Sequence, residues 1–166
     1  MFYDEVLTKL RDAEVRFVVV GAVAMNLHGV PRMTADLDLL VDLSEPNLSA
    51  LLQALEDLGY KPRLPVPASA LLDSECRREW VEQRNLKAFT FIHPLRPLQE
   101  VDLLLESPVS FEEADRQKTV LAAGRLRIPV ISLDHLIAMK RGSNRAQDAA
   151  DVEALERLKR LLGGSG

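Results

Sequence analysis

The sequence has little cysteine and few aromatic residues: Cys76 is its single cysteine, and aromatics make up 5% of the chain. One cysteine excludes an intramolecular disulfide, and the three histidines show no metal-binding spacing, so we expect no Cys/His zinc site. No apolar run approaches the roughly 20 residues that a membrane-spanning helix needs. The N-terminal segment lacks the basic and then apolar pattern of a secretion signal, which predicts a cytoplasmic protein.

An excess of positive charge is also missing. Lysine and arginine together number 21 against 25 aspartates and glutamates, which gives a formal net charge of −4. This balance argues against broad, charge-driven binding of nucleic acid, although a local basic groove stays open. A length of 166 residues and a hydrophobic content of 47% predict one globular domain, residues 1–166, with a substantial core.

The most informative stretch is residues 16–42, RFVVVGAVAMNLHGVPRMTADLDLLVD. Its apolar run at 17–20 has the length of a buried strand, and residues 22–28 predict a short helix. Gly21 and Ala22 lie at the turn between them. Small residues at a strand-to-helix turn let backbone N–H groups approach an anion, and the helix N-terminus adds positive partial charge. This unit therefore predicts a phosphate-binding turn.

A second strand, predicted at 35–41, carries Asp36 and Asp38. Residues two apart in a strand point to the same face, so the two carboxylates lie side by side on a mostly apolar strand. Their repulsion and desolvation are costly, and a divalent cation such as Mg²⁺ would remove both costs. The alternative is that both side chains face solvent at a strand end, and D-x-D alone does not choose between them.

The remaining segments predict an α/β (α+β) fold, because helical and strand patterns alternate along the chain. Helices are expected at 3–13, 44–58, 68–84, 110–117, 132–142 and 145–162, and strands at 87–92, 100–105, 119–123 and 125–131.

The pattern G-A-x(13)-D-L-D, with an apolar strand before each part, resembles the nucleotidyltransferase superfamily related to DNA polymerase beta. The fuller stretch, with HG at 28–29, R-x-T at 32–34 and DLDLLVD at 36–42, resembles its minimal, abortive-infection type branch, found among toxin–antitoxin systems. The aminoglycoside and lincosamide nucleotidyltransferases are similar more distantly. One departure is Ala22, where the family usually has Gly or Ser; alanine keeps the backbone N–H but lacks a hydroxyl.

The resemblance implies a mixed β-sheet flanked by helices, with a catalytic core at 14–106 and a C-terminal hairpin and helices at 107–162. It also implies Mg²⁺ or Mn²⁺ held by Asp36, Asp38 and a third carboxylate from a later strand of the same sheet. Asp102 is the expected third ligand, because it lies in the middle of its strand while Glu100 and Glu106 flank it.

The same resemblance implies that the N–H groups around Gly21 and Ala22 hold phosphates, and that Arg32 and Lys140 offset the charge of the leaving group. Lys140 begins the pattern K-x(4)-R-x-x-D-x-x-D, which continues with Arg145, Asp148 and Asp151 and is common in the minimal branch. Lysine binds phosphate as a point charge. The alternative for Arg145 and Asp148 is a surface ion pair at i, i+3 spacing.

The implied activity is transfer of a nucleoside monophosphate from a nucleoside triphosphate to an acceptor hydroxyl on an RNA end, a protein or a small molecule. A toxin–antitoxin role would add a partner protein. The alternative hypothesis is a catalytically degenerate binding or regulatory module with the same fold. Ala22 favours that alternative, whereas the retention of all three acidic candidates, Asp36, Asp38 and Asp102, argues against it.

Overall fold

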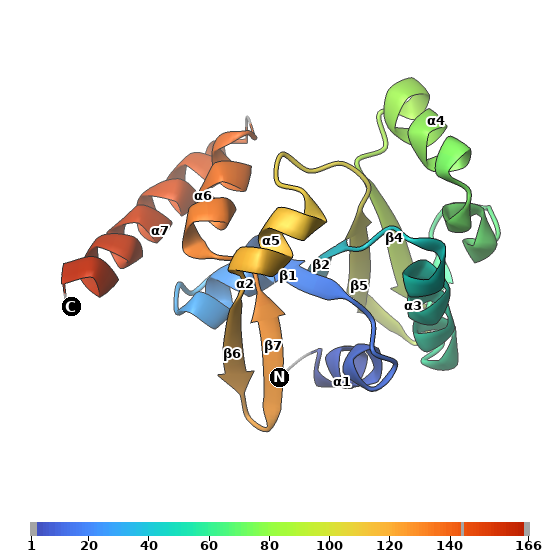
Figure 1. Cartoon of the computed structure of the whole chain (residues 1–166), viewed down its shortest axis with the longest axis horizontal. Coiled ribbons are helices and arrows are strands. Elements are labelled where there is room, and N and C mark those ends of the chain that lie inside the picture. Colours follow the sequence, from blue (N-terminus) through green and yellow to red (C-terminus); the bar gives the residue numbers. More distant parts are fainter. Residues whose placement is uncertain (1–2, 144, 165–166) are drawn as a thin grey trace.

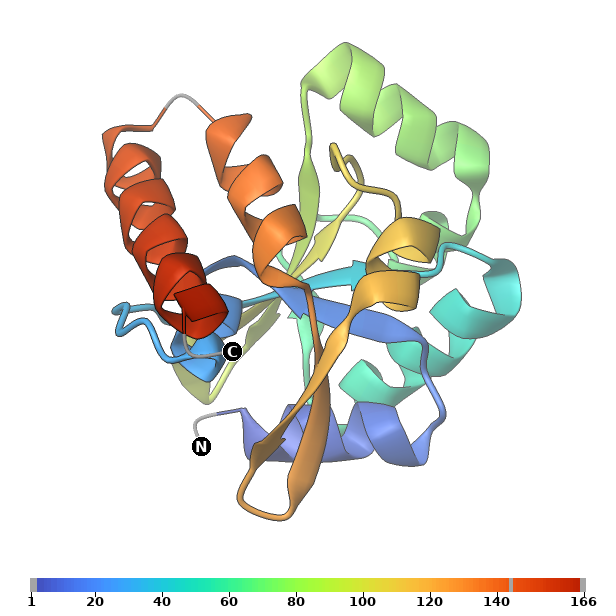
Figure 2. The same cartoon turned by 60° about the vertical axis from the view of Figure 1, so that its left-hand side comes forward.

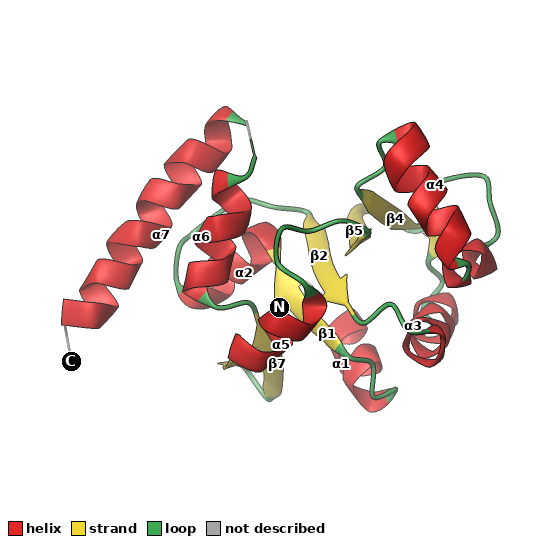
Figure 3. Cartoon of the chain, turned by 45° about the horizontal axis from the view of Figure 1, so that its top comes forward, coloured by secondary structure: helices red, strands yellow, loops and turns green. Residues whose placement is uncertain are grey.

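The structure is a computed structural model, and it describes residues 3–143 and 145–164. Figure 1 shows its elements in chain order, and Figure 3 colours them by type. The helices are α1 (Asp4–Asp12), α2 (Gly21–His28), α3 (Glu45–Asp57), a 3₁₀ helix (Ala68–Leu72), α4 (Ser74–Arg84), α5 (Phe111–Gln117), α6 (Leu133–Arg141) and α7 (Ala146–Gly164). The strands are β1 (Phe17–Val20), β2 (Asp36–Val41), β3 (Lys61–Pro62), β4 (Ala88–His93), β5 (Arg96–Leu104), β6 (Thr119–Ala123) and β7 (Leu126–Val130).

The described strands form one seven-stranded sheet in the order β3-β4-β5-β2-β1-β7-β6. β2 runs antiparallel to β1 and parallel to β5, and β1 runs parallel to β7, so the sheet is mixed. The predicted fold class, a mixed sheet flanked by helices, is confirmed. The order places β2 at the centre of the sheet, between the first and the fifth strand of the chain.

Helices lie at both ends of this sheet, as Figures 1 and 2 show. α6 and α7 pack side by side as a hairpin beyond β1 and β7, while α3, the 3₁₀ helix and α4 lie near β3 and β4. α2 joins the α6–α7 hairpin to the central strands of the sheet, because it contacts β1, β2 and α6. Among the described residues, no helix combines the length and apolar character needed to cross a membrane.

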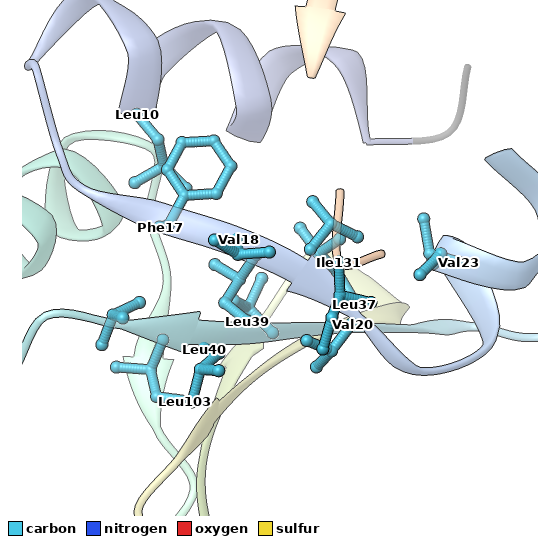
Figure 4. Packing of buried hydrophobic residues seen from close by; sticks show 14 of the residues in the cluster. Leu10, Phe17, Val18, Val20, Val23, Leu37, Leu39, Leu40, Leu103 and Ile131 are labelled. Atoms are coloured by element: carbon cyan, nitrogen blue, oxygen red, sulfur yellow. The ribbon is translucent and has the colours of Figure 1, made fainter. Parts of the chain in front are cut away.

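The core follows from the alternation of side chains along the central strands. Leu37 and Leu39 of β2 are fully buried, and Leu103 of β5 lies directly opposite Leu39. Figure 4 shows these leucines within the buried cluster that also includes Val18 and Val20 of β1, and Val19 of β1 lies directly opposite Leu39. Because side chains alternate between faces, burying the leucines turns the intervening carboxylates of β2 to the opposite face of the sheet.

One predicted helix is divided. Residues 68–84 form the 3₁₀ helix and α4 instead of one continuous helix. Asp73 separates them in an extended conformation, and its carboxylate accepts a 2.9 Å hydrogen bond from the backbone N–H of Glu75. An aspartate that caps a helix N-terminus in this way starts a new helix, which explains the break.

Candidate active site

Three predicted carboxylates meet at the centre of the sheet. Asp38 of β2 lies opposite Asp102 of β5, and Asp36 lies opposite Glu100 in the same parallel register. Residues paired across neighbouring strands share a face, so these side chains lie together although more than sixty positions separate them in the chain. Asp36, Asp38 and Asp102 all line a single cavity of about 580 Å³ between the sheet and the α6–α7 hairpin.

Gly21 has a steric role that the sequence did not reveal. Its φ of +71° lies in the left-handed region, and a Cβ placed there would come within 2.1 Å of Oδ2 of Asp38. Glycine therefore lets the Asp38 carboxylate sit against the first turn of α2. That turn has no side-chain cap, so the positive end of the helix faces the carboxylates.

The carboxylates of this cavity are electrostatically crowded. Burial, followed by the charges of Asp102 and Asp36, raises the pKa of Asp38 to about 7. Burial and the charges of Asp102 and Glu100 also raise the pKa of Asp36, against a smaller opposing effect of Arg63. The ionised forms are thus destabilised until a cation binds.

An oxygen-rich set of this kind fits a hard divalent cation such as Mg²⁺, which would relieve the repulsion. Among the described residues, no three or more His, Cys, Asp or Glu side chains are grouped so that they could hold a metal ion as they stand. Asp38 and Asp102 are aligned by the strand register, and Asp38 is seated by the glycine turn. The donor set is therefore compatible with metal binding.

The opposite wall of the cavity comes from the α6–α7 hairpin. Lys140 of α6 lines the cavity, and its Nζ lies 3.0 Å from Oδ2 of Asp151 and 3.4 Å from Oδ1 of Asp148. Both aspartates are buried, at 3% and 2% exposed. Lys140 is therefore held at the cavity by Asp151 and by Asp148, which also lines the cavity.

These two aspartates have lowered pKa values. Burial raises the pKa of Asp151, but hydrogen bonds from Gln147 and Lys140 and the charges of Lys140 and Arg32 outweigh it. Burial likewise raises the pKa of Asp148, and a hydrogen bond from Ser143 with the charges of Lys140 and Arg145 outweighs it. Both carboxylates are thus stabilised as anions.

Two predicted phosphate contacts lie away from the cavity lining. Arg32 donates from Nε to Oδ1 of Asp151 at 3.1 Å, and its backbone is held by the side chain of Asn26 through hydrogen bonds of 2.6 and 2.8 Å. Ala22 follows Gly21 inside α2 and is not among the lining residues. The structure thus brings together Gly21, Asp36, Asp38, Asp102 and Lys140 from the predicted set.

Sequence reasoning did not select several other residues of the site. Lys87 and Ser143 line the cavity, and Thr90 donates a 2.6 Å hydrogen bond from Oγ1 to Oδ1 of Asp102. A lysine before a strand and a serine between helices carry no distinguishing signal. Thr90 has a weak one, because it is the single polar residue between two phenylalanines in the strand AFTFIH.

The fold is that of a nucleotidyltransferase. Comparison with known families agrees: the family described as "Nucleotidyltransferase of unknown function (DUF6036)" matches residues 3–161. The chain therefore belongs to this family, and it is a nucleotidyltransferase enzyme. A search of curated proteins gave no match. The predicted membership of the superfamily is confirmed, while the abortive-infection branch stays a prediction.

Solved structures show the same fold. The lincosamide antibiotic adenylyltransferase LnuA, solved with lincomycin bound, has a TM-score of 0.60 at 16% identity, and the match covers 92% of each chain. ANT(2″)-Ia, in complex with adenylyl-2″-tobramycin, has a TM-score of 0.58 at 11% identity, covering 96% of this chain and 92% of its own. A Thermotoga maritima protein solved as a candidate nucleotidyltransferase, TM1012, has a TM-score of 0.52 at 17% identity, covering 96% and 89%.

Proposed function

We propose that this enzyme moves a nucleoside monophosphate from a nucleoside triphosphate to an acceptor hydroxyl, with Mg²⁺ or Mn²⁺ as cofactor. The observation that carries the proposal is the convergence of Asp36, Asp38 and Asp102 on one cavity that Lys140 also lines. Carboxylates crowded enough to raise the pKa of Asp38 to about 7 gain most from a bound cation.

In this proposal Asp36 and Asp38 hold the metal, and Asp102 completes the set. The bound metal would act as a Lewis acid on the phosphoryl oxygens and lower the pKa of the acceptor hydroxyl. Asp102 would accept the hydroxyl proton as the acceptor oxygen bonds to the α-phosphorus. The bond from that phosphorus to the bridging oxygen then breaks, and pyrophosphate leaves with the electron pair.

The triphosphate would lie across the start of α2 and towards α6. The N–H groups at Gly21 and Ala22 would face the phosphates at the uncapped helix end. Lys140 would offset the charge gathering on the leaving group. Arg32, paired with Asp151 at 3.1 Å, would add positive charge behind Lys140 instead of touching the ligand.

Among the four ribonucleotides we expect ATP to be preferred, since LnuA is an adenylyltransferase and ANT(2″)-Ia was solved with an adenylylated product. The acceptor hydroxyl would belong to an RNA end, a protein or a small molecule. The protein would work in the cytoplasm, where nucleoside triphosphates and Mg²⁺ are abundant.

Calorimetric titration tests this proposal. The four ribonucleoside triphosphates are titrated, with and without Mg²⁺, into the wild type, Asp38→Asn and the control Asp12→Asn, whose carboxylate is exposed on α1. We expect Mg²⁺-dependent binding to the wild type and to the control, and its loss in Asp38→Asn. Absence of binding to the wild type, or full binding to Asp38→Asn, would contradict the proposal and favour a catalytically degenerate binding module.

The resemblance to the toxin–antitoxin branch leads us to propose a toxic activity that a partner protein restrains. Expression of the wild type without a partner should then slow the growth of a bacterial host, and Asp38→Asn should not. Equal growth with both proteins, at equal expression, would remove the toxin–antitoxin role and leave the transfer reaction itself unaffected.

A further inference from the structure

Thr90 of β4 lies next to the carboxylates of β5 and β2 in the sheet register. β4 buries Phe89 and Phe91, each 1% exposed, on the core face of the sheet, where Phe89 also stacks on Trp80 at a centroid distance of 5.3 Å. Alternation turns Thr90 to the opposite face. There it lies directly opposite Asp102, whose other neighbour in the register is Asp38. The row Thr90, Asp102, Asp38 thus crosses three adjacent strands.

A hydrogen bond links the first two members of this row. Oγ1 of Thr90 donates to Oδ1 of Asp102 at 2.6 Å, a length typical of a hydroxyl bound to a carboxylate. The donor itself is fixed. Threonine is stiff at χ1 because it is β-branched, and the Thr90 carbonyl accepts a 2.9 Å bond from the backbone N–H of Arg63. Arg63, which directly follows β3, and strand β5 therefore hold the Thr90 backbone from both sides.

The Asp102 carboxylate lies between two neighbours in the sheet register. On one side Thr90 Oγ1 donates to its Oδ1, and on the other side Asp38 is its partner in the strand register. A fixed donor on Oδ1 sets the plane of the carboxylate and determines which oxygen lone pairs face the cavity. A carboxylate whose plane is held presents its oxygens to a metal in a fixed orientation, which strengthens binding.

We propose that Thr90 is a positioning residue that orients Asp102 for metal binding. The inference rests on the proposed function, because Asp102 is assigned as a metal ligand only there. Thr90 itself touches neither the metal nor the substrate in this scheme; it acts through its hydroxyl on Asp102.

Three variants test the role of the hydroxyl. Thr90→Val keeps the volume and the β-branch but removes the donor, and Thr90→Ser keeps the donor. Thr119→Val, on the exposed edge strand β6, is the matched control for the same chemical change. The Kd for Mn²⁺ is measured by calorimetry without nucleotide, and thermal unfolding shows that each variant is folded.

We expect Thr90→Val to weaken Mn²⁺ binding by about 10-fold or more, as loss of a partner that orients a metal ligand does elsewhere. The Kd of Thr90→Ser for Mn²⁺ should stay within about threefold of the wild-type value, and the Kd of Thr119→Val should equal the wild-type value. A merely structural role would lower the unfolding temperature of Thr90→Val without changing its Kd.

The outcomes separate this inference from the proposed function. If the wild type binds Mn²⁺, Asp38→Asn does not, and folded Thr90→Val binds it as well as the wild type, the role of Thr90 is wrong and the metal site stands. The role is equally wrong if Thr90→Ser is as weak as Thr90→Val. If the wild type binds no Mn²⁺, both ideas fail, because Asp102 then has no metal to bind.

Discussion

Two groups of carboxylates lie on opposite sides of the same cavity, and their surroundings differ. On the sheet, Asp38 faces Asp102 and Asp36, and burial together with those like charges raises its pKa to about 7. On α7, Asp151 is 3% exposed, yet its pKa is lowered. Burial alone raises the pKa in both places, so the neighbouring charges determine the direction of the shift. These neighbours are carboxylates around Asp38 and cations around Asp151.

The difference distinguishes carboxylates that are paired within the protein from carboxylates that we propose to be functional. Asp148 and Asp151 are satisfied within the protein by Lys140, Arg32 and Arg145, so they need no ligand. The carboxylates of the sheet face one another and have no comparable set of cations at hydrogen-bond distance among the described residues. Retention of such a costly group of carboxylates in a folded protein favours a role for them in binding a cation.

The largest effect is expected from removing a carboxylate of α7 that is paired with cations within the protein. Asp151→Ala leaves Lys140 and Arg32 without their shared buried partner, so we expect the free energy of unfolding to fall by about 4 kcal/mol. Chemical denaturation measures this loss. The control is Glu153→Ala, which removes an exposed ion pair with Arg157 and should cost at most about 0.5 kcal/mol. Equal losses in both variants would mean that the α7 carboxylates are not a structural centre.

The second effect concerns the turn that seats Asp38. Gly21→Ala places a Cβ at a φ of +71° and 2.1 Å from the Asp38 carboxylate. Backbone strain and the clash together should cost about 3 kcal/mol and displace the carboxylate, with loss of Mn²⁺ binding.

Gly124→Ala is the matched control, because Gly124 has a φ of +63° with no atom within 4 Å of its added Cβ. It should cost only the backbone strain, about 1 kcal/mol, and leave Mn²⁺ binding intact. Calorimetry and denaturation separate the two costs. If Gly21→Ala behaves like Gly124→Ala, the close approach of Asp38 to the turn does not matter for the site.

The third prediction uses pH to contrast the two sides. The pKa of Asp38 is raised from 3.8 to about 7, so in metal-free protein its favourable contribution is present below pH 4 and is lost as the pH rises through 7. Asp38→Asn should therefore stabilise the protein at pH 8 in EDTA by about 2 kcal/mol and change little at pH 4.

The contribution of Asp151 to stability depends on pH in the opposite direction. Its pKa is lowered, so its contribution is present above the ordinary pKa of an aspartate and is lost as the pH falls through the lowered value. Unfolding measured from pH 3 to pH 8 should show opposite slopes for the stability changes caused by Asp38→Asn and Asp151→Asn. Parallel slopes would contradict the contrast between the two sides.

The smallest effect is expected at Ala22. Ala22→Ser adds the hydroxyl that the superfamily usually offers a residue after the glycine, while the backbone N–H stays in place. Affinity for a nucleoside triphosphate with Mg²⁺, measured by calorimetry, should be unchanged or slightly improved. A large loss of affinity would show that the start of α2 does not hold the phosphates.

Local sequence patterns predicted most of the elements correctly. The apolar run at 17–20 and the alternation of D-L-D-L at 36–39 became β1 and β2, because the period of a strand is legible in a few residues. The division of the helix at 68–84 was missed, because an aspartate inside a mixed-charge run gives no sign that it will cap a new helix.

The site was predictable in part for the same reason. Strand geometry predicts that Asp36 and Asp38 share a face. The register of β2 with β5, in which they lie opposite Glu100 and Asp102, agrees with this. The positions of Arg32 and Thr90 were not predictable. Arg32 reaches Asp151 across 119 residues, and Thr90 reaches Asp102 through a hairpin register that depends on where the turn falls.

By itself, the sequence determined the order of strand, glycine turn, helix and acidic strand, because those features depend on neighbours along the chain. The tertiary structure alone decided that Asp102 stands beside Asp38, that Gly21 makes room for a carboxylate, and that Lys140 is held by buried aspartates. The reason is physical: strand pairing and helix packing are set by burial of the whole core, and only that burial brings distant charges into one cavity.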